Sequence, residues 1–146
     1  MTSILPLRLE DLDDWSELWG GYLRFYESDV PADVTRETFR RITADDGVHG
    51  AIARDDEGNA IGLVHWLTHP STWSISGYCY LEDLFVDPST RGAGTGRALI
   101  AHVRAWAEQQ GCEKVYWLTQ DGNVTARRLY DRVASHTGFT HYEIEL

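Results

Sequence analysis

The stretch that decides the fold reads Arg91-Gly92-Ala93-Gly94-Thr95-Gly96-Arg97, and it joins two segments of different periodicity. Residues 78–86, before it, have the aromatic and branched composition of a strand, which ends at Pro88. After it, Leu99 and Trp106 recur at helical spacing. A strand, a glycine-rich turn and a helix in this order are typical of an anion-binding loop. The glycines let a ligand approach the backbone, and the first helical amides have no partner inside the helix.

Two better-known phosphate motifs fit this run poorly. A P-loop requires a lysine after its last glycine, and none follows here. A dinucleotide-binding fingerprint is Gly-x-Gly-x-x-Gly at the first strand-to-helix turn, whereas Gly92, Gly94 and Gly96 alternate and come after several strands. Arg91 and Arg97 flank the run and supply positive charge that suits a diphosphate. On the glycines alone, a tight turn without a ligand stays open.

Composition narrows the class of protein. The chain has 146 residues, of which 42% are hydrophobic, and no repeat or linker divides it, so we expect one domain over residues 1–146. Thirteen basic against twenty-three acidic residues give a net charge of −10, which disfavours nucleic-acid binding and favours a cationic partner. Cys79 and Cys112 have no zinc-ligand spacing, and the histidines show none either, so no metal is expected. Without a long apolar run we expect no membrane segment and a cytoplasmic location.

The hydrophobic patterns predict an α/β (α+β) protein with the element order βααβββαβαβ. A helix following Glu10, a second helix beginning near Pro31, a third after the glycine run and a fourth capped by Asn123 are expected. The expected strands are residues 4–9, 48–53, 60–67, 78–86, 114–119 and 139–146.

The glycine run also carries a resemblance to a known family. With Leu84-Phe85-Val86-Asp87-Pro88 before it and Ala98-Leu99-Ile100 after it, it resembles the acetyl-CoA signature of the GCN5-related N-acetyltransferases (GNAT). Residues 123–130 and the Gly138-Phe139 pair match that superfamily too, and residues 80–86 are similar to its diamine/polyamine and fungal histone/polyamine acetyltransferase subgroup. The resemblance implies the GNAT fold, a mixed, mostly antiparallel sheet flanked by helices.

The resemblance also implies acetyl-CoA as the co-substrate and assigns residues to it. The pantetheine arm is expected along the fourth strand, which a bulge would separate from the next strand. The pyrophosphate is expected on the amides of the glycine loop. The residues that the resemblance assigns to the cofactor are Leu84, Phe85, Val86, Arg91, Gly92, Ala93, Gly94, Thr95, Gly96, Arg97, Asn123, Ala126 and Tyr130.

Acetyl transfer to an alkyl amine needs a base, because such an amine has a pKa near 10.4 and is mostly protonated at neutral pH. The resemblance implies that Glu82 is this base, while strand alternation predicts that Asp83 points to the opposite face. Tyr130 lies two helical turns after Asn123, on nearly the same face, and the resemblance makes it the general acid for the leaving thiolate. Without the resemblance, Glu82 could be a solvated strand-end charge and Tyr130 a core aromatic.

The expected substrate is a small amine. Tyr26 and Glu27, between the first two helices, resemble the pair that meets the amine in polyamine acetyltransferases, and with Glu82 they form the predicted acceptor site. We therefore predict an N-acetyltransferase acting on a primary amine of a polyamine, diamine or amino-acid-like substrate by direct attack in a ternary complex. A protein or peptide acetyltransferase and a non-catalytic acetyl-CoA sensor are the alternatives. The closing strand 139–146 offers an edge to a second copy, so a homodimer is expected.

Overall fold

The computed structural model describes all 146 residues, which divide into two compact units, Met1–Tyr116 and Trp117–Leu146. The elements of the first unit are β1 (Ser3–Pro6), the 3-10 turn Leu9–Asp11, α1 (Leu12–Phe25), α2 (Ala32–Thr43), β2 (His49–Arg54), β3 (Ala60–Ser71), β4 (Ser74–Val86), the 3-10 turn Pro88–Thr90, α3 (Thr95–Gln109) and β5 (Val115–Tyr116). The second unit contains α4 (Val124–Val133). No helix is long and apolar enough to cross a bilayer.

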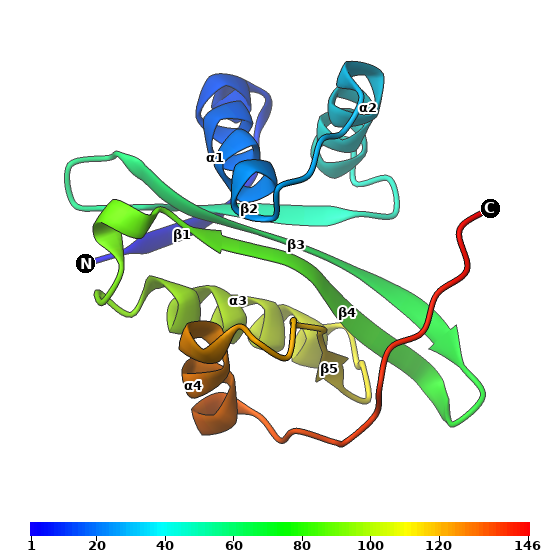
Figure 1. Ribbon diagram of the computed structural model, residues 1–146. Helices are drawn as coiled ribbons and strands as arrows, with labels where there is room; N and C mark the ends of the chain where they lie inside the picture. Colours follow the sequence, from blue (N-terminus) through cyan, green and yellow to red (C-terminus); the bar gives the residue numbers. More distant parts are fainter. The chain divides into compact units, whose positions relative to one another are not determined.

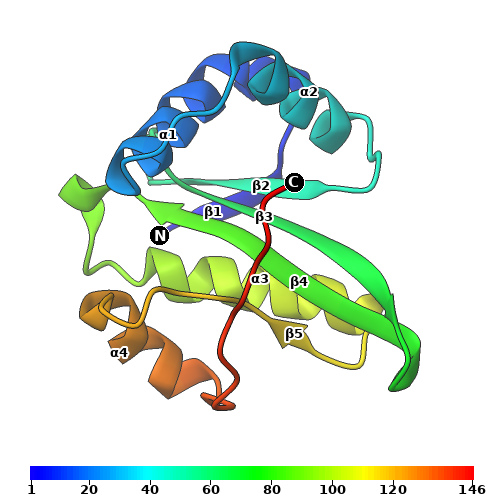
Figure 2. The same cartoon turned by 45° about the vertical axis from the view of Figure 1, so that its right-hand side comes forward.

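The first unit is a five-stranded sheet in the order β1-β2-β3-β4-β5, with helices on both faces (Figure 1). The first four strands pair antiparallel and β5 joins β4 in parallel, which confirms the predicted mixed, mostly antiparallel sheet. Helices α1 and α2 lie on one face and α3 lies on the other, as Figure 2 shows from a second side.

Helices α1, α2 and α3 of the first unit are amphipathic, and the apolar side of each is buried against the sheet. On the α1/α2 face the core includes Trp15, Phe39, Ile52, Leu63 and Phe85. On the α3 face, apolar side chains of α3 pack under the same strands. The buried members of α3 are Leu99, Ile100, Val103 and Ala107. The sheet therefore buries side chains on both faces, which explains the nearly continuous apolar stretch of β3.

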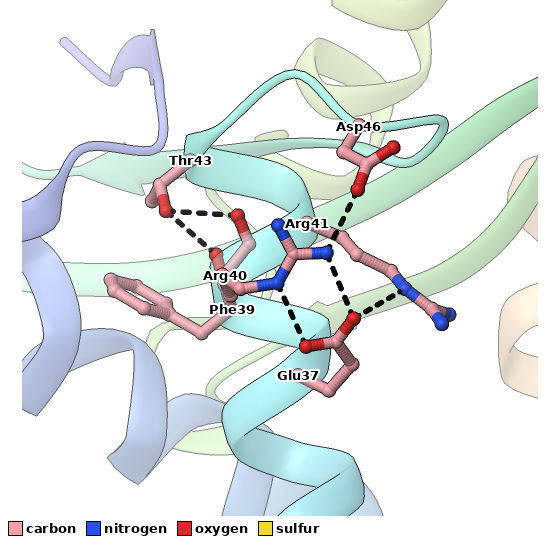
Figure 3. A network of polar contacts seen from close by, with 6 residues as sticks. All are labelled: Glu37, Phe39, Arg40, Arg41, Thr43 and Asp46. Atoms are coloured by element: carbon pink, nitrogen blue, oxygen red, sulfur yellow. Dashed lines mark hydrogen bonds and ion pairs between the residues drawn. The ribbon is translucent and has the colours of Figure 1, made fainter.

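Polar contacts close the end of α2 (Figure 3). Arg40 donates to the Glu37 carboxylate at 2.8 and 2.9 Å and to Asp46 Oδ2 at 2.8 Å, and Arg41 donates to the same Glu37. Thr43 Oγ1 donates to the carbonyl of Phe39 one turn back. The Arg40–Asp46 bond joins the last turn of the helix to the loop that leads into β2.

Two strand predictions need correction. The predicted strand 114–119 forms over Val115–Tyr116 alone. The predicted strand 139–146 is wrong, because the last strand of the structure is β5 and residues 139–146 form no strand. A strand exists only through backbone pairing, and an alternating pattern does not by itself supply a partner. The alternating side chains Tyr142, Ile144 and Leu146 are exposed, as is Phe139.

Candidate acetyl-transfer site

A bulge in β4 is the central feature of the site. His65 pairs with Asp83 and the next residue of β3, Trp66, pairs with Leu81, so Glu82 is an extra residue on β4. The resemblance led us to expect a bulge in this strand, and the structure places it at Glu82. An extra residue shifts the side-chain alternation by one. The prediction that Asp83 points away from Glu82 is therefore wrong.

Glu82 and Asp83 both lie on the α1 side of the sheet. His65, which pairs with Asp83, accepts a hydrogen bond from the buried α1 residue Trp15. The hydroxyl of Tyr22, also on α1, hydrogen-bonds Asp83, and the charge of Glu82 acts on that same hydroxyl. Burial, and then the two carboxylates, raise the pKa of Tyr22, so this phenol stays protonated.

The surroundings of Glu82 make its carboxylate more basic than that of an ordinary glutamate. Its side chain is open to solvent, but the protein around it displaces part of its hydration. That desolvation, followed by repulsion from Asp83, raises the pKa of Glu82. A carboxylate with a raised pKa that remains accessible is suited to accept a proton from an incoming group.

The outer edge of β4 is unpaired next to the bulge. β5 pairs with β4 only at Cys79 and Tyr80, so Leu81–Val86 have no β5 partner. Asp87 N–H donates to Ile61 O on β3, and alternate residues of an antiparallel strand face the same neighbour. The backbone groups of Leu84 and Val86 therefore face the free edge.

Phe85 differs from its two neighbours. Its ring is buried in the core of the α1/α2 face, and its backbone groups face β3. Of the three residues predicted to hold an extended ligand, Leu84 and Val86 thus offer backbone hydrogen-bonding groups to it. Phe85 instead anchors the strand to the core through its buried side chain.

The glycine loop leads into α3 as the sequence predicts. Gly92 and Gly94 have φ of +92° and +79°, and a Cβ at either would meet no atom within 4 Å. Gly94 is the N-cap of α3 and no side chain caps the helix, so the amides of Thr95, Gly96 and Arg97 have no helical acceptor. Thr95 Oγ1 is also buried without a hydrogen-bond partner. Open space beside unpaired donors at a helix N-terminus fits the pyrophosphate of coenzyme A.

The remaining predicted residues of the first unit lie around these two features. The Tyr26 ring is tilted against the Tyr22 ring with 4.9 Å between their centroids, and burial followed by the charge of Asp83 raises the pKa of Tyr26, so its hydroxyl lies on the Asp83 side of the site. Glu27, with φ of +51°, is exposed. The Arg91 guanidinium lies 5.7 Å from the Phe25 ring centre, which ties the glycine loop to the end of α1. Arg97 and Ala93 are exposed.

The second unit holds the other predicted residues. The Asn123 side chain accepts a hydrogen bond from Ala126 N at 3.3 Å, so it caps α4 as the sequence predicts. Tyr130, on the same helix, packs edge-on against Trp117 with 5.4 Å between ring centroids.

Sequence reasoning missed the residues that hold Asp83. His65 lies in the predicted strand 60–67 and Tyr22 in the predicted first helix, and only the folded arrangement of β3, β4 and α1 brings them to one carboxylate. The helical spacing of Trp15 and Tyr22 placed both on one face of α1, which is the single signal that the sequence offered. No group of His, Cys, Asp and Glu residues could hold a metal ion.

Comparison with known proteins identifies the family. Residues 12–134 match the model described as acetyltransferase (GNAT) family. The D-amino-acid N-acetyltransferase HPA3 of Saccharomyces cerevisiae is 37% identical over 136 residues, which cover 92% of this chain and 84% of the yeast protein. The thialysine N-epsilon-acetyltransferase of Caenorhabditis elegans is 33% identical over 99 residues, 68% of this chain and 61% of the nematode protein. The chain therefore belongs to the GNAT family and is an N-acetyltransferase.

Solved structures show the same fold. AAC(6')-Iy in complex with the bisubstrate analog CoA-S-monomethyl-acetylneamine superimposes with a TM-score of 0.86 at 23% identity, covering 100% of this chain and 99% of that one. The ribosomal-protein-alanine N-acetyltransferase of Brucella melitensis biovar Abortus 2308 gives a TM-score of 0.84 at 22% identity over all of both chains. Acetyltransferases of this family use acetyl-CoA, which agrees with the predicted co-substrate.

Proposed function

We propose that the chain transfers the acetyl group of acetyl-CoA to the primary amine of a small cationic acceptor, namely a diamine, a polyamine or an amino-acid-like amine. The observation that carries the proposal is the pair of carboxylates, Glu82 and Asp83, on one face of a bulge beside an unpaired strand edge. Two adjacent carboxylates attract an ammonium group, and the aromatic face of Tyr26 adds to this attraction. The relatives that act on D-amino acids and on thialysine support an amino-acid-like acceptor.

The proposed mechanism is a direct attack by the amine. Bound acetyl-CoA supplies the thioester carbonyl. Glu82 accepts a proton from the bound ammonium and passes it to solvent, and the freed nitrogen forms a bond to the carbonyl carbon as the carbon–sulfur bond breaks. The nitrogen of the new amide then loses its second proton, again through Glu82 to solvent. Tyr130 donates its phenolic proton to the departing thiolate, since phenols and thiols have similar proton affinities, and solvent returns that proton.

The proposed cofactor contacts divide between strand and loop. The backbone groups of Leu84 and Val86 face the free edge of β4, where they pair with the amides of the pantetheine arm. The unpaired amides of the first α3 turn, with Arg91 and Arg97, bind the pyrophosphate. Asn123 and Ala126 on α4 supply further contacts by resemblance.

An acceptor screen tests the proposal. The protein is mixed with acetyl-CoA and separate pools of D-amino acids, L-amino acids, diamines, polyamines and basic peptides, and thiol release is measured. We expect turnover with a free amine that Glu82→Gln and Tyr130→Phe each reduce by about 100-fold or more, the usual contribution of general acid–base residues. Glu27→Gln serves as a control for lost charge on the acceptor loop and should change KM only. Turnover of peptides alone would refute the small-amine acceptor, and acetyl-CoA binding without any turnover would indicate a sensor.

We further propose that residues 1–146 act as one domain and that the protein is a cytoplasmic homodimer. The family match over 12–134 runs through both compact units, which supports the single domain. The exposed alternating apolar side chains of residues 139–146 support pairing with a second copy. Light scattering on the full chain and on a chain ending at residue 138 tests this, and two monomeric species would refute the dimer.

A further inference from the structure

A series of hydrogen bonds runs from Trp15 on α1, through His65 on β3, to the Asp83 carboxylate on β4. Trp15 Nε1–H donates to His65 Nε2 at 3.0 Å, and His65 Nδ1 lies 3.0 Å from Asp83 Oδ2. Trp15 and His65 are 1% and 2% exposed, so water cannot replace either bond. Neither residue touches the predicted ligand positions, and the proposed mechanism does not use them.

The partners on both sides of His65 settle where its proton lies. An indole N–H can only donate, so His65 Nε2 presents a lone pair and the ring proton is on Nδ1. His65 is thereby a neutral donor to Asp83, and protonation of Nε2 would break the bond to Trp15. Asp83 receives a second bond from the hydroxyl of Tyr22, which burial keeps protonated. Hydrogen bonds from β3 and from α1 thus fix the position of this carboxylate.

Glu82, in contrast to Asp83, receives no hydrogen bond at its side chain, and its carboxylate is exposed. The titratable groups that face it are Asp83 and Tyr80 on β4, His65 on β3 and Tyr22 on α1. The pKa values of the two tyrosines are raised, so both are uncharged, and Asp83 is the neighbouring carboxylate whose charge repels that of Glu82. Of the two carboxylates, Asp83 is held in place by hydrogen bonds, and Glu82 is free to accept a proton.

We propose that Trp15 and His65 are positioning residues for the proton acceptor: through their hydrogen bonds they fix the Asp83 carboxylate beside Glu82, and its negative charge makes Glu82 a stronger base. This inference rests on the proposed role of Glu82. The raised pKa of Glu82, to which repulsion from Asp83 contributes, agrees with it. In the reaction the amine proton moves to Glu82 while Asp83 stays ionised.

The first test is independent of activity. Nitrogen-15 NMR of the imidazole rings at about pH 7 should show His65 as the neutral Nδ1–H tautomer. Trp15→Phe removes the donor to Nε2, so signals of a protonated Nε2 should then appear. Trp19→Phe is the matched control, because its ring packs 5.3 Å from His65 and makes no hydrogen bond to it. A charged or Nε2–H His65 in the unmodified protein overturns the proposal, whether or not Glu82 is the base.

The second test is the pH profile of kcat/KM. Asp83→Asn keeps the shape and removes the charge, so the acid limb that reports Glu82 should move to lower pH. His65→Leu removes the donor to Asp83 and should move the limb in the same direction, while His65→Asn, which keeps an N–H near the Nδ1 position, should retain the original limb. If the acid limb lies at the same pH in the unmodified protein and in all three variants, the positioning role is overturned. A profile that survives Glu82→Gln would instead refute the proposed base, and the NMR result would stand.

Discussion

Replacing Gly94 by alanine separates the two proposed roles of the glycine loop, which are to adopt a left-handed turn before α3 and to bind the pyrophosphate of acetyl-CoA. Gly94 has φ of +79° and is the N-cap of α3, and an added Cβ would meet no protein atom within 4 Å. The substitution therefore places one methyl group in open space beside the unpaired amides of the first helical turn. Within the folded protein its only cost is the left-handed backbone.

That cost can be estimated. A residue with a Cβ loses roughly 1–2 kcal/mol in the left-handed region compared with glycine. For a chain of this length this corresponds to a fall of about 3–8 °C in Tm. The methyl group also lies where the pyrophosphate is proposed to bind. The loss of one charge-assisted hydrogen bond, about 1.5–3 kcal/mol, would weaken the binding of acetyl-CoA by roughly 10- to 100-fold.

The assay compares Gly94→Ala with Gly47→Ala. Gly47 is exposed, has φ of +81° and likewise has no atom within 4 Å of an added Cβ, but it lies in the loop between α2 and β2. Calorimetric melting should show similar losses of stability for the two variants, and titration with acetyl-CoA should show weaker binding for Gly94→Ala alone. Equal affinity in both variants would refute the placement of the pyrophosphate on this loop.

Three further predictions concern stability and reactivity. Leu63→Ala, at a position with 0% exposure, should lower the free energy of unfolding by about 2–5 kcal/mol in a denaturant titration, and a loss below 1 kcal/mol would contradict tight packing on the α1 face. Hydrogen bonds from Arg40 lower the pKa of Glu37 to about 2, from an ordinary 4.5, so their contribution is present above pH 4.5 and lost as the pH falls toward 2. Glu37→Gln should therefore lower Tm at pH 6 and leave it unchanged at pH 2, and a difference that grows with acid would show that the sign is wrong. Burial raises the pKa of Cys79 to about 12, so at pH 8 a thiol reagent should modify the half-buried Cys112 alone in the folded protein, and fast reaction of two thiols would refute this.

The sequence predicted most of the fold because most elements carry a local signal. The apolar spacing in α1 and α3, the turn between β2 and β3 and the Asn123 cap depend on neighbouring residues, and these elements were predicted correctly. Strand ends were predicted less well. β3 and β4 extend beyond the apolar stretch because they pair with each other as a long hairpin, whereas residues 139–146 have the strand pattern without a partner.

The candidate site could be predicted in part, for a similar reason. The glycine loop is contiguous in sequence, so its residues and its geometry follow from one motif. The surroundings of Glu82 depend on which residue of β3 stands opposite Asp83, and a period-2 pattern cannot report one extra residue in a strand. The sequence therefore placed Asp83 on the wrong face and gave no reason to connect His65 or Tyr22 with it.

The bulge links the two halves of the proposed chemistry. Because side chains alternate along a regular strand, a β4 without the extra residue could direct Glu82 or Asp83 toward α1, but not both. With the extra residue, Asp83 reaches His65 and Tyr22 while Glu82 stays free. Pairing with β5 ends at Tyr80, two residues before Glu82, so the unpaired edge begins where the carboxylates converge. An extended ligand on that edge would thus bring its reactive end next to the one carboxylate that no hydrogen bond restrains.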